Sequence, residues 1–295
     1  MSMKKFLVVG DRSLTESGLH RKHAFGEYLR DTVSDFGTVD IVPIDKIVFD
    51  IRKGSFEALV PAEGIDLKTY DAIYVRSLRI FGAYVSQFAA YHNIPCINDY
   101  SRYYTGSKMA QTLVFLNAGV DFLPTYYAID NHTLATYVAH KVGYPFILKA
   151  DNGARGESNY LIGSETELSQ ALEAEPDIDF IAQDFCHNDR DYRLLMVGSS
   201  RLIFERRGKP DTHLNNTSKG GAVSLVNDDE LPPYIIAEAR ILAEQLGLII
   251  AGFDVIPKFG TNEYYFLEVN SEPQLRTGML LEEKQELLRA LFSSF

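Results

Sequence analysis

Two segments read AGFDVIP (251–257) and YYFLEVN (264–270), with the polar segment KFGTNE between them. Apolar stretches on both sides of a short polar turn predict an antiparallel hairpin. If its register is symmetric about Thr261, Asp254 and Glu268 face each other across the two strands. Directly opposed Cβ atoms lie ~5 Å apart, so two bare carboxylates in these positions repel each other. A cation between them would remove that repulsion.

Asn270 lies two residues beyond Glu268, and the two-residue period of a strand puts both side chains on the same face. Three oxygen-bearing side chains then converge, and Mg²⁺ takes a few protein oxygens together with waters and substrate phosphates. The hairpin therefore predicts a platform for a nucleotide and its metal, held by Asp254, Glu268 and Asn270. The spacing is equally compatible with a solvated face that carries scattered acids.

The first 100 residues alternate apolar runs, at 6–9, 39–44 and 72–75, with helix-like segments. This alternation is typical of a parallel sheet with crossover helices. The first run ends without the glycine spacing of a dinucleotide-binding turn, and the sequence holds no P-loop motif. Arg76 follows the run at 72–75, where such a sheet presents the carboxyl ends of its strands, so it is a candidate for binding a substrate carboxylate.

A change of pattern near residue 100 indicates a second domain of mixed strands and helices. Lys149 ends an apolar strand there, and a buried lysine stem can hold its ammonium over phosphates. The glycine-rich stretch that follows, Gly153-Ala154-Arg155-Gly156, could close its backbone N–H groups over a triphosphate as a mobile flap. An ordinary β-turn is the alternative for this stretch.

A second candidate segment for nucleotide binding is the strand end Gln183-Asp184-Phe185, which Asp191 follows closely. An apolar strand end offers walls and backbone edges for an adenine, and the carboxylate of Asp191 offers a partner for a ribose.

The composition restricts the class of protein. A chain of 295 residues with a net charge of −11 predicts about two domains and a field that repels nucleic acid and anionic membranes. No apolar run approaches the length of a membrane span, so we expect no membrane partner. The two cysteines, Cys96 and Cys186, form no CxxC motif, which suits a reducing compartment. We expect a cytoplasmic enzyme.

Taken in order, these residues resemble the ATP-grasp superfamily, and most closely its RimK-type and glutathione-synthetase-like carboxylate–amine ligases. The resemblance covers about residues 70–278, and its motifs are Lys108 before a helix, Lys149, Gln183-Asp184-Phe185, Asp191-Tyr192-Arg193, and finally Asp254, Glu268 and Asn270. The fold that it implies is α/β (α+β): a parallel N-terminal pre-ATP-grasp domain, with nucleotide bound between two α+β subdomains. The implied domains are 1–100 for substrate, 101–184 with the glycine flap, and 185–295 with the metal site.

The resemblance also implies roles for single residues. Lys108 and Lys149 would hold phosphates, and the backbone around Gln183 would read adenine. Asp191 would bind ribose. The late acidic set would hold two magnesium ions, with Mn²⁺ as a substitute. Arg206 matches the arginine that stabilises the transferring phosphoryl group and the acyl-phosphate.

Departures from the family pattern concern the substrate pocket. Asp184 stands where the family usually has glutamate, one methylene longer. In the segment Asn215-Asn216-Thr217-Ser218-Lys219-Gly220-Gly221, Asn216 and the glycines align, which keeps Asn216 as a nucleotide ligand. Lys219 replaces an arginine and loses its bidentate geometry, so Lys219 and Gly220 are candidates for a pocket that differs from the family's.

The resemblance implies an ATP-dependent ligase that joins a carboxylate to an amine through an acyl-phosphate. Amino acids, peptides or a protein tail are the substrate candidates, and a dimer or tetramer is expected. Two alternatives use the same nucleotide site. One is an ATP-grasp kinase that phosphorylates a hydroxyl, and the other is a nucleotide-binding protein without turnover.

Overall fold

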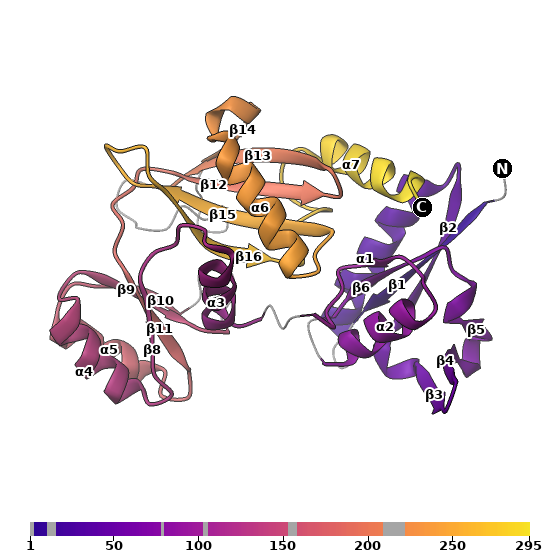
Figure 1. The fold of residues 1–295 in the computed structure, drawn as a ribbon, viewed down its shortest axis with the longest axis horizontal. Coiled ribbons are helices and arrows are strands. Elements are labelled where there is room, and N and C mark those ends of the chain that lie inside the picture. Colours follow the sequence, from indigo (N-terminus) through magenta and orange to yellow (C-terminus); the bar gives the residue numbers. More distant parts are fainter. Residues whose placement is uncertain (1–2, 11–15, 78–79, 103–105, 153–157, 209–221) are drawn as a thin grey trace.

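The computed structural model describes residues 3–10, 16–77, 80–102, 106–152, 158–208 and 222–295. Its N-terminal unit holds a parallel sheet with strand order β2-β1-β6-β7 (Figure 1). The strands and their helices are β1 (Lys4–Gly10), α1 (Glu16–Val33), β2 (Gly37–Pro43), β6 (Ala72–Arg76), α2 (Ile80–Tyr91) and β7 (Cys96–Ile97). The parallel sheet expected from the alternating pattern is therefore confirmed.

Both faces of the central strand β1 are buried, which explains its continuous apolar run. Phe6 and Val8 pack in one core with residues of α1 and the C-terminal helix, while Leu7 and Val9 pack in another with residues of α2. Helices on both faces are the usual cover of a parallel sheet.

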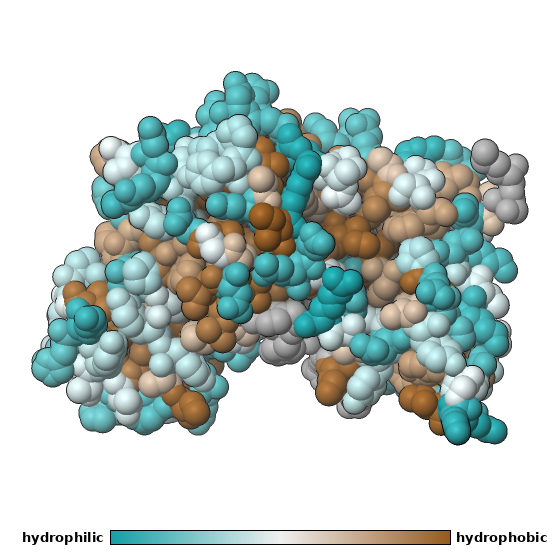
Figure 2. Space-filling model, in the orientation of Figure 1, coloured by the Kyte–Doolittle hydropathy of each residue, from teal (hydrophilic) through white to brown (hydrophobic). Residues whose placement is uncertain are grey.

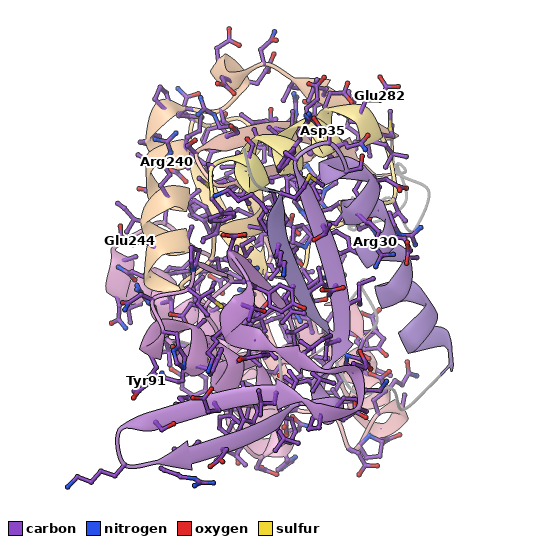
Figure 3. The ribbon with its side chains drawn as sticks, turned by 90° about the vertical axis from the view of Figure 1, so that its right-hand side faces the viewer. Arg30, Asp35, Tyr91, Arg240, Glu244 and Glu282 are labelled. Carbon is purple, nitrogen blue, oxygen red and sulfur yellow. The ribbon has the colours of Figure 1, made fainter. Side chains whose placement is uncertain are left out.

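A small antiparallel sheet of β3 (Val48–Arg52), β4 (Ser55–Val60) and β5 (Ile65–Asp66) follows β2. It was not expected from the sequence. Phe56 packs edge-on against Phe88 of α2, with ring centroids 5.4 Å apart, and this contact attaches the hairpin to the unit. Figure 3 shows the hairpin projecting at the end of the molecule opposite α7 (Leu281–Ser293).

The second sheet is antiparallel, with strand order β10-β9-β11-β8. Its elements are β8 (Thr125–Tyr127), α4 (Asn131–Lys141), β9 (Phe146–Ala150), β10 (Asn159–Ile162), α5 (Glu165–Ala174) and β11 (Phe180–Asp184). Leu134 and Leu168 from the helices pack on Leu148 in a separate small core. Ser164 caps α5, because its hydroxyl accepts the Glu167 N–H at 3.3 Å, and the Glu167 carboxylate in turn accepts the Gly163 N–H at 2.7 Å.

The third sheet has five antiparallel strands in the order β14-β13-β12-β15-β16. Its elements are β12 (Asp191–Val197), β13 (Ser200–Arg207), β14 (Ala222–Val226), α6 (Pro233–Gln245), β15 (Ile250–Pro257) and β16 (Tyr264–Asn270), followed by α7. One face packs on α6 through residues such as Leu194 and Phe253, which are fully buried. Alternation along the strands puts the charged residues of this sheet on the other face.

Helix α3 (Lys108–Ala118) packs against the edge strand β16 of the third sheet and also contacts β8 of the second. The side-chain amide of Gln111 donates to the Val269 carbonyl at 3.0 Å and accepts the Val269 N–H at 2.8 Å, so it satisfies the edge of β16. Leu113 and Leu116 on the outer side of α3 stay exposed, and Figure 2 shows brown surface around α3 and α6. The proposed boundary at residue 101 remains a prediction.

The C-terminal helix α7 returns to the N-terminal unit. Arg289 forms an ion pair with Asp35 and donates to the Thr32 carbonyl at 3.1 Å, while Leu288 and Phe292 are buried against the core of the parallel sheet. Figure 3 labels Asp35 beside this helix. The helix thereby joins the first and last segments of the chain. In the described ranges, no helix combines the length and apolarity that a membrane crossing requires.

Candidate active site

The predicted hairpin register is present where it matters for the site. Asp254 pairs with Glu268 and Gly252 pairs with Asn270. Nearer the turn the prediction is wrong, because Val255 pairs with Phe266 and not with Leu267. A bulge beside Asp254 adds one residue to β16, and the symmetric register ends there.

A buried cluster of charges surrounds Asp254. Both of its carboxylate oxygens accept from Arg193 on β12, and one also lies 3.0 Å from the Nη2 of Arg206 on β13. The Nε of Arg206 donates to Asp191, which pairs with it across the two strands. All four side chains lie on one face of the third sheet. Because buried charges are stable only with partners, two arginines and two aspartates hold one another in place.

The two aspartates of this cluster differ in their proton affinity. Burial raises the pKa of Asp191 to about 6, although Arg206 opposes the rise. Burial also acts to raise the pKa of Asp254, but Arg193 and Arg206 outweigh it and leave that pKa below its usual range. Asp254 is therefore ionised at neutral pH, and in this structure both of its carboxylate oxygens accept from arginines.

Lys149 brings the second sheet to the same place. Lys149 lies in β9 and is 7% exposed. The negative charges of Glu268 and Asp254 in the third sheet act to raise its pKa, so the three side chains lie near one another. Burial lowers the pKa of Lys149 to about 8, and the nearby Lys108 lowers it further while the two carboxylates oppose the shift. The structure thus brings together Lys149 and the hairpin, which lie 105 and more residues apart in the sequence.

Lys108 is the first residue of α3, and that helix end is anchored beside Lys149. The Asp151 carboxylate accepts the Met109 N–H at 2.7 Å and the Ser107 hydroxyl at 3.0 Å. The Nζ of Lys108 donates to the Asp151 carbonyl at 3.3 Å. A helix N-terminus carries partial positive charge, and here the Asp151 carboxylate occupies it, with Lys108 and Lys149 close by.

In the predicted adenine-binding segment 183–185, some of the polar groups already form hydrogen bonds within the protein. Gln183 is buried and its amide donates to the Thr125 hydroxyl at 2.8 Å, while the Asp184 N–H donates to the Pro124 carbonyl at 3.0 Å. Phe185 is half-buried just after β11. Asp191 bonds to Arg206, so in this structure its carboxylate is engaged in the charge cluster and does not form an open edge for a ribose.

Arg76 is enclosed at the carboxyl end of β6. Its guanidinium lies 3.9 Å from the ring centroid of Phe25, and one nitrogen lies 3.6 Å from the Glu272 carboxylate. The Nε and Nη1 atoms are buried and have no hydrogen-bond partner among the described residues. Arg76 therefore reaches the loop that follows β16. Its role as a substrate ligand stays a prediction.

Several candidate residues lie outside the described ranges. These are the flap residues Gly153, Ala154, Arg155 and Gly156, and the pocket residues Asn216, Lys219 and Gly220.

The donor set of the hairpin fits a magnesium ion. Asp254 and Glu268 face each other and Asn270 follows on the same side, so the three side chains can present oxygen atoms to one point. Carboxylate and amide oxygens are hard ligands of the kind that Mg²⁺ prefers. Only two carboxylates are involved, and the described residues hold no group of three or more His, Cys, Asp or Glu side chains that converge as a metal site.

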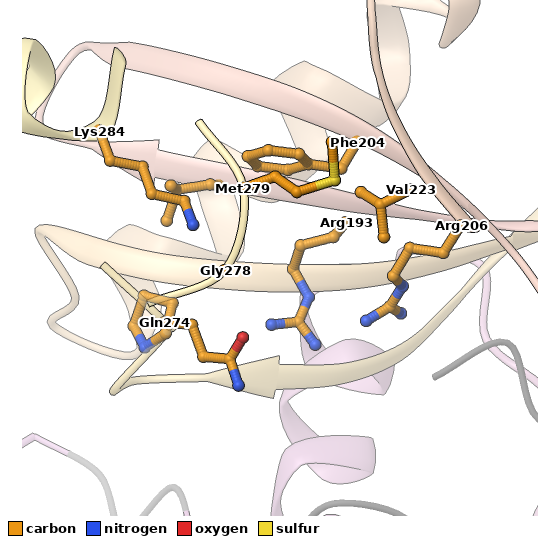
Figure 4. A pocket seen from close by; sticks show the side chains of 10 residues that line it. Arg193, Phe204, Arg206, Val223, Gln274, Gly278, Met279 and Lys284 are labelled. Atoms are coloured by element: carbon orange, nitrogen blue, oxygen red, sulfur yellow. The ribbon is translucent and has the colours of Figure 1, made fainter. Parts of the chain in front are cut away.

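Sequence reasoning missed the cavity that opens on this face of the sheet. It has a volume of about 240 Å³, and Arg193 and Arg206 line it together with Lys284 from α7 (Figure 4). Helix α7 was not predicted, although its buried positions 284, 288 and 292 follow helical spacing. That periodicity was the available signal for Lys284.

Comparisons with known proteins agree with this geometry. Residues 105–286 match the RimK-like ATP-grasp domain. A probable alpha-L-glutamate ligase from Mannheimia succiniciproducens is 27% identical over 220 residues, which are 71% of each chain. A second probable alpha-L-glutamate ligase, from Maridesulfovibrio salexigens, is 23% identical over 227 residues, which are 75% of this chain and 70% of that protein.

Solved structures share the whole fold. D-alanine–D-alanine ligase from Bacillus anthracis superposes with a TM-score of 0.71 at 14% identity, over 98% of this chain and 96% of that one. The macrocyclase MdnC from Microcystis aeruginosa, bound with its precursor peptide MdnA, gives a TM-score of 0.69 at 12% identity, over 98% and 99%.

The fold and the family match define an ATP-dependent ligase of the ATP-grasp class. The chain belongs to the RimK-like ATP-grasp family, because the family match covers more than half of its length.

Proposed function

We propose that the protein activates a substrate carboxylate with ATP as an acyl-phosphate and transfers the acyl group to an amine. The observation that carries this proposal is the convergence of Lys149 with Asp254 and Glu268, whose charges act on the pKa of Lys149. Phosphoryl transfer depends on positioning and charge neutralisation, and these residues provide both signs of charge at one point.

Each residue has one role in the proposed reaction. Lys108 and Lys149 bind the phosphates, and Arg206 stabilises the charge on the transferring phosphoryl group. Asp254, Glu268 and Asn270 would hold two magnesium ions, for which Mn²⁺ can substitute. When bound, these ions neutralise phosphate charge and orient the γ-phosphate.

The proposed reaction has two steps, a phosphoryl transfer and an acyl transfer. A carboxylate oxygen forms a bond to the γ-phosphorus, and the bond from that phosphorus to the leaving oxygen of ADP breaks. The amine nitrogen then bonds to the acyl carbon, phosphate leaves with the electron pair of the C–O bond, and the amine loses a proton. Since the relatives are named glutamate ligases and one structural neighbour is bound with a peptide, we propose an amino acid or a peptide as substrate.

Product analysis tests the reaction class. A ligase releases phosphate from Mg-ATP only when carboxylate and amine are both present, and the product mass equals that of the two substrates minus one water. A phosphorylated product that accumulates with a hydroxyl compound would replace this proposal with a kinase. ATP binding without release of phosphate under any pairing would leave a nucleotide-binding protein.

Substitution of Glu268 by Gln tests the metal platform. Glu268→Gln keeps the volume of the side chain and removes one charge, so turnover should fall about 100-fold while the thermal midpoint stays within the range of the wild type. Glu263→Gln is the matched control, because Glu263 is an exposed residue at the turn of the same hairpin. Equal turnover of Glu268→Gln and Glu263→Gln would contradict the assignment.

Three further parts of the proposal concern the whole protein. We propose the domain division at residues 100 and 184, assembly into a dimer or tetramer, and a cytoplasmic location. Light scattering of the purified chain measures the assembly directly.

A further inference from the structure

The cavity on the charged face of the third sheet has two kinds of wall. Phe204 and Val223 from the sheet and Met279 from the loop before α7 are apolar, and Arg193 and Arg206 enter beside them (Figure 4). Its volume of about 240 Å³ lies below the ~300–1,000 Å³ of typical drug-sized pockets. An amino acid or the last residue of a peptide is the size of ligand that it can hold.

Among the described residues, Lys284 lines this cavity without an ionised partner in direct contact. The two arginines bond to Asp254 and Asp191, whereas the Nζ of Lys284 donates to the neutral carbonyl of Thr277 at 3.0 Å. Lys284 is only 5% exposed. An ammonium that leaves water loses solvation free energy, and one carbonyl contact replaces only part of it.

Lys284 occupies a position in α7 where an apolar side chain would avoid this loss of solvation free energy. Lys284 precedes Leu288 and Phe292 at spacings of four, so it occupies the buried stripe of an amphipathic helix. A methionine or leucine would continue this stripe without any loss of solvation. The Nζ also lies 5.6 Å from the ring centroid of Phe204, so the charge sits at the cavity wall and not in solvent.

We propose that this cavity is the substrate subsite and that Lys284 selects a carboxylate held away from the reacting group. The proposal rests on the proposed ligase function. The reacting end of the substrate lies toward Arg206, the apolar walls hold its methylene groups, and the far carboxylate pairs with Lys284. The ligand is therefore an acidic amino acid, or the carboxyl end of a peptide.

Equilibrium binding tests the subsite without a need for turnover. The probes are L-glutamate, L-glutamine and the dipeptide Ala-Glu, each titrated into the full chain saturated with Mg-ADP. Glutamate or Ala-Glu should bind the wild type at least tenfold more tightly than Lys284→Met, and glutamine should bind both proteins alike. The free amino acid and the peptide distinguish the two sources of the carboxylate.

Three comparisons keep this test decisive. Lys284→Arg keeps the charge and should retain most of the affinity, while Lys53→Met at the exposed β3–β4 turn should bind like the wild type. Lys284→Gln replaces Lys284→Met if that variant fails to fold. If neither glutamate nor Ala-Glu binds the wild type more tightly than it binds the uncharged variants, the subsite is refuted. If the wild type does not bind Mg-ADP at all, that result would instead refute the proposed ligase function.

Discussion

Lys149 combines a buried charge with a position at the predicted phosphate site. A lysine whose pKa is lowered from 10.5 to about 8 by burial makes the folded state less stable wherever both states are protonated. This cost is present in full below pH 8, and it is lost as the pH rises from about 8 to 10.5, because the folded state releases its proton first. Under the proposed function, a phosphate bound at this ammonium would offset the cost.

The substitution Lys149→Met should therefore raise stability and remove nucleotide affinity. We expect the unfolding free energy of the nucleotide-free protein to increase by up to ~3 kcal/mol at pH 7 and by much less at pH 10. Chemical denaturation at both pH values measures the gain, and titration with Mg-ATP measures the affinity. A variant that is less stable at pH 7, or that binds ATP as well as the wild type, would contradict the assignment.

At the scale of single elements, the N-terminus of α3 connects stability with binding. The Ser107 hydroxyl accepts the Ala110 N–H at 3.0 Å, and Asp151 accepts the N–H one residue earlier. The same anchor places Lys108 beside the carbonyl of Asp151. A change at the cap should therefore loosen a lysine that we assign to the phosphates.

Ser107→Ala and Ser164→Ala form a matched pair of cap variants. Each removes a serine that caps a helix, so each should lower the unfolding free energy by about 1 kcal/mol. Only Ser107→Ala should also weaken ATP binding, by several-fold or ~1 kcal/mol, because α5 lies away from the site. Thermal denaturation and nucleotide titration separate the two effects. Equal ATP affinity in both variants would show that the α3 cap is purely structural.

At the scale of the whole molecule, Asn98 fastens the N-terminal unit to the third sheet. Its amide donates to the carbonyls of Ile250 at 2.9 Å and Ser271 at 2.7 Å, and its oxygen accepts the N–H groups of Ile249 and Ile250. The residue is fully buried and has a positive φ of 61°, which asparagine tolerates better than most residues. Four hydrogen bonds of one side chain thus span 151 residues of sequence or more.

Asn98→Ala should destabilise the protein by about 2–4 kcal/mol, because it leaves buried backbone groups without partners. Asn93→Ala is the control. Asn93 has a similar φ of 56° but is exposed, so its substitution reports the backbone strain alone. Denaturant titration of both variants gives the difference. A loss in Asn98→Ala no larger than that in Asn93→Ala would mean that these hydrogen bonds contribute little.

The amino-acid sequence by itself determined the parallel sheet, the hairpin and the pairing of Asp254 with Glu268. These features depend on local periodicity and on short turns, which neighbouring residues express directly. The motif order from Lys108 to Asn270 also indicated the family. The sequence did not indicate the β3–β5 sheet or helix α7, and it did not reveal the bulge that ends the symmetric register.

Only the tertiary structure decided which charges meet. Arg193 bonds to Asp254 because β12 and β15 are adjacent in the sheet, although 61 residues separate them. Lys284 enters the cavity because α7 turns back across the same sheet to reach α1. Such contacts depend on long-range packing and on the cost of burying charge, neither of which a local pattern of residues records.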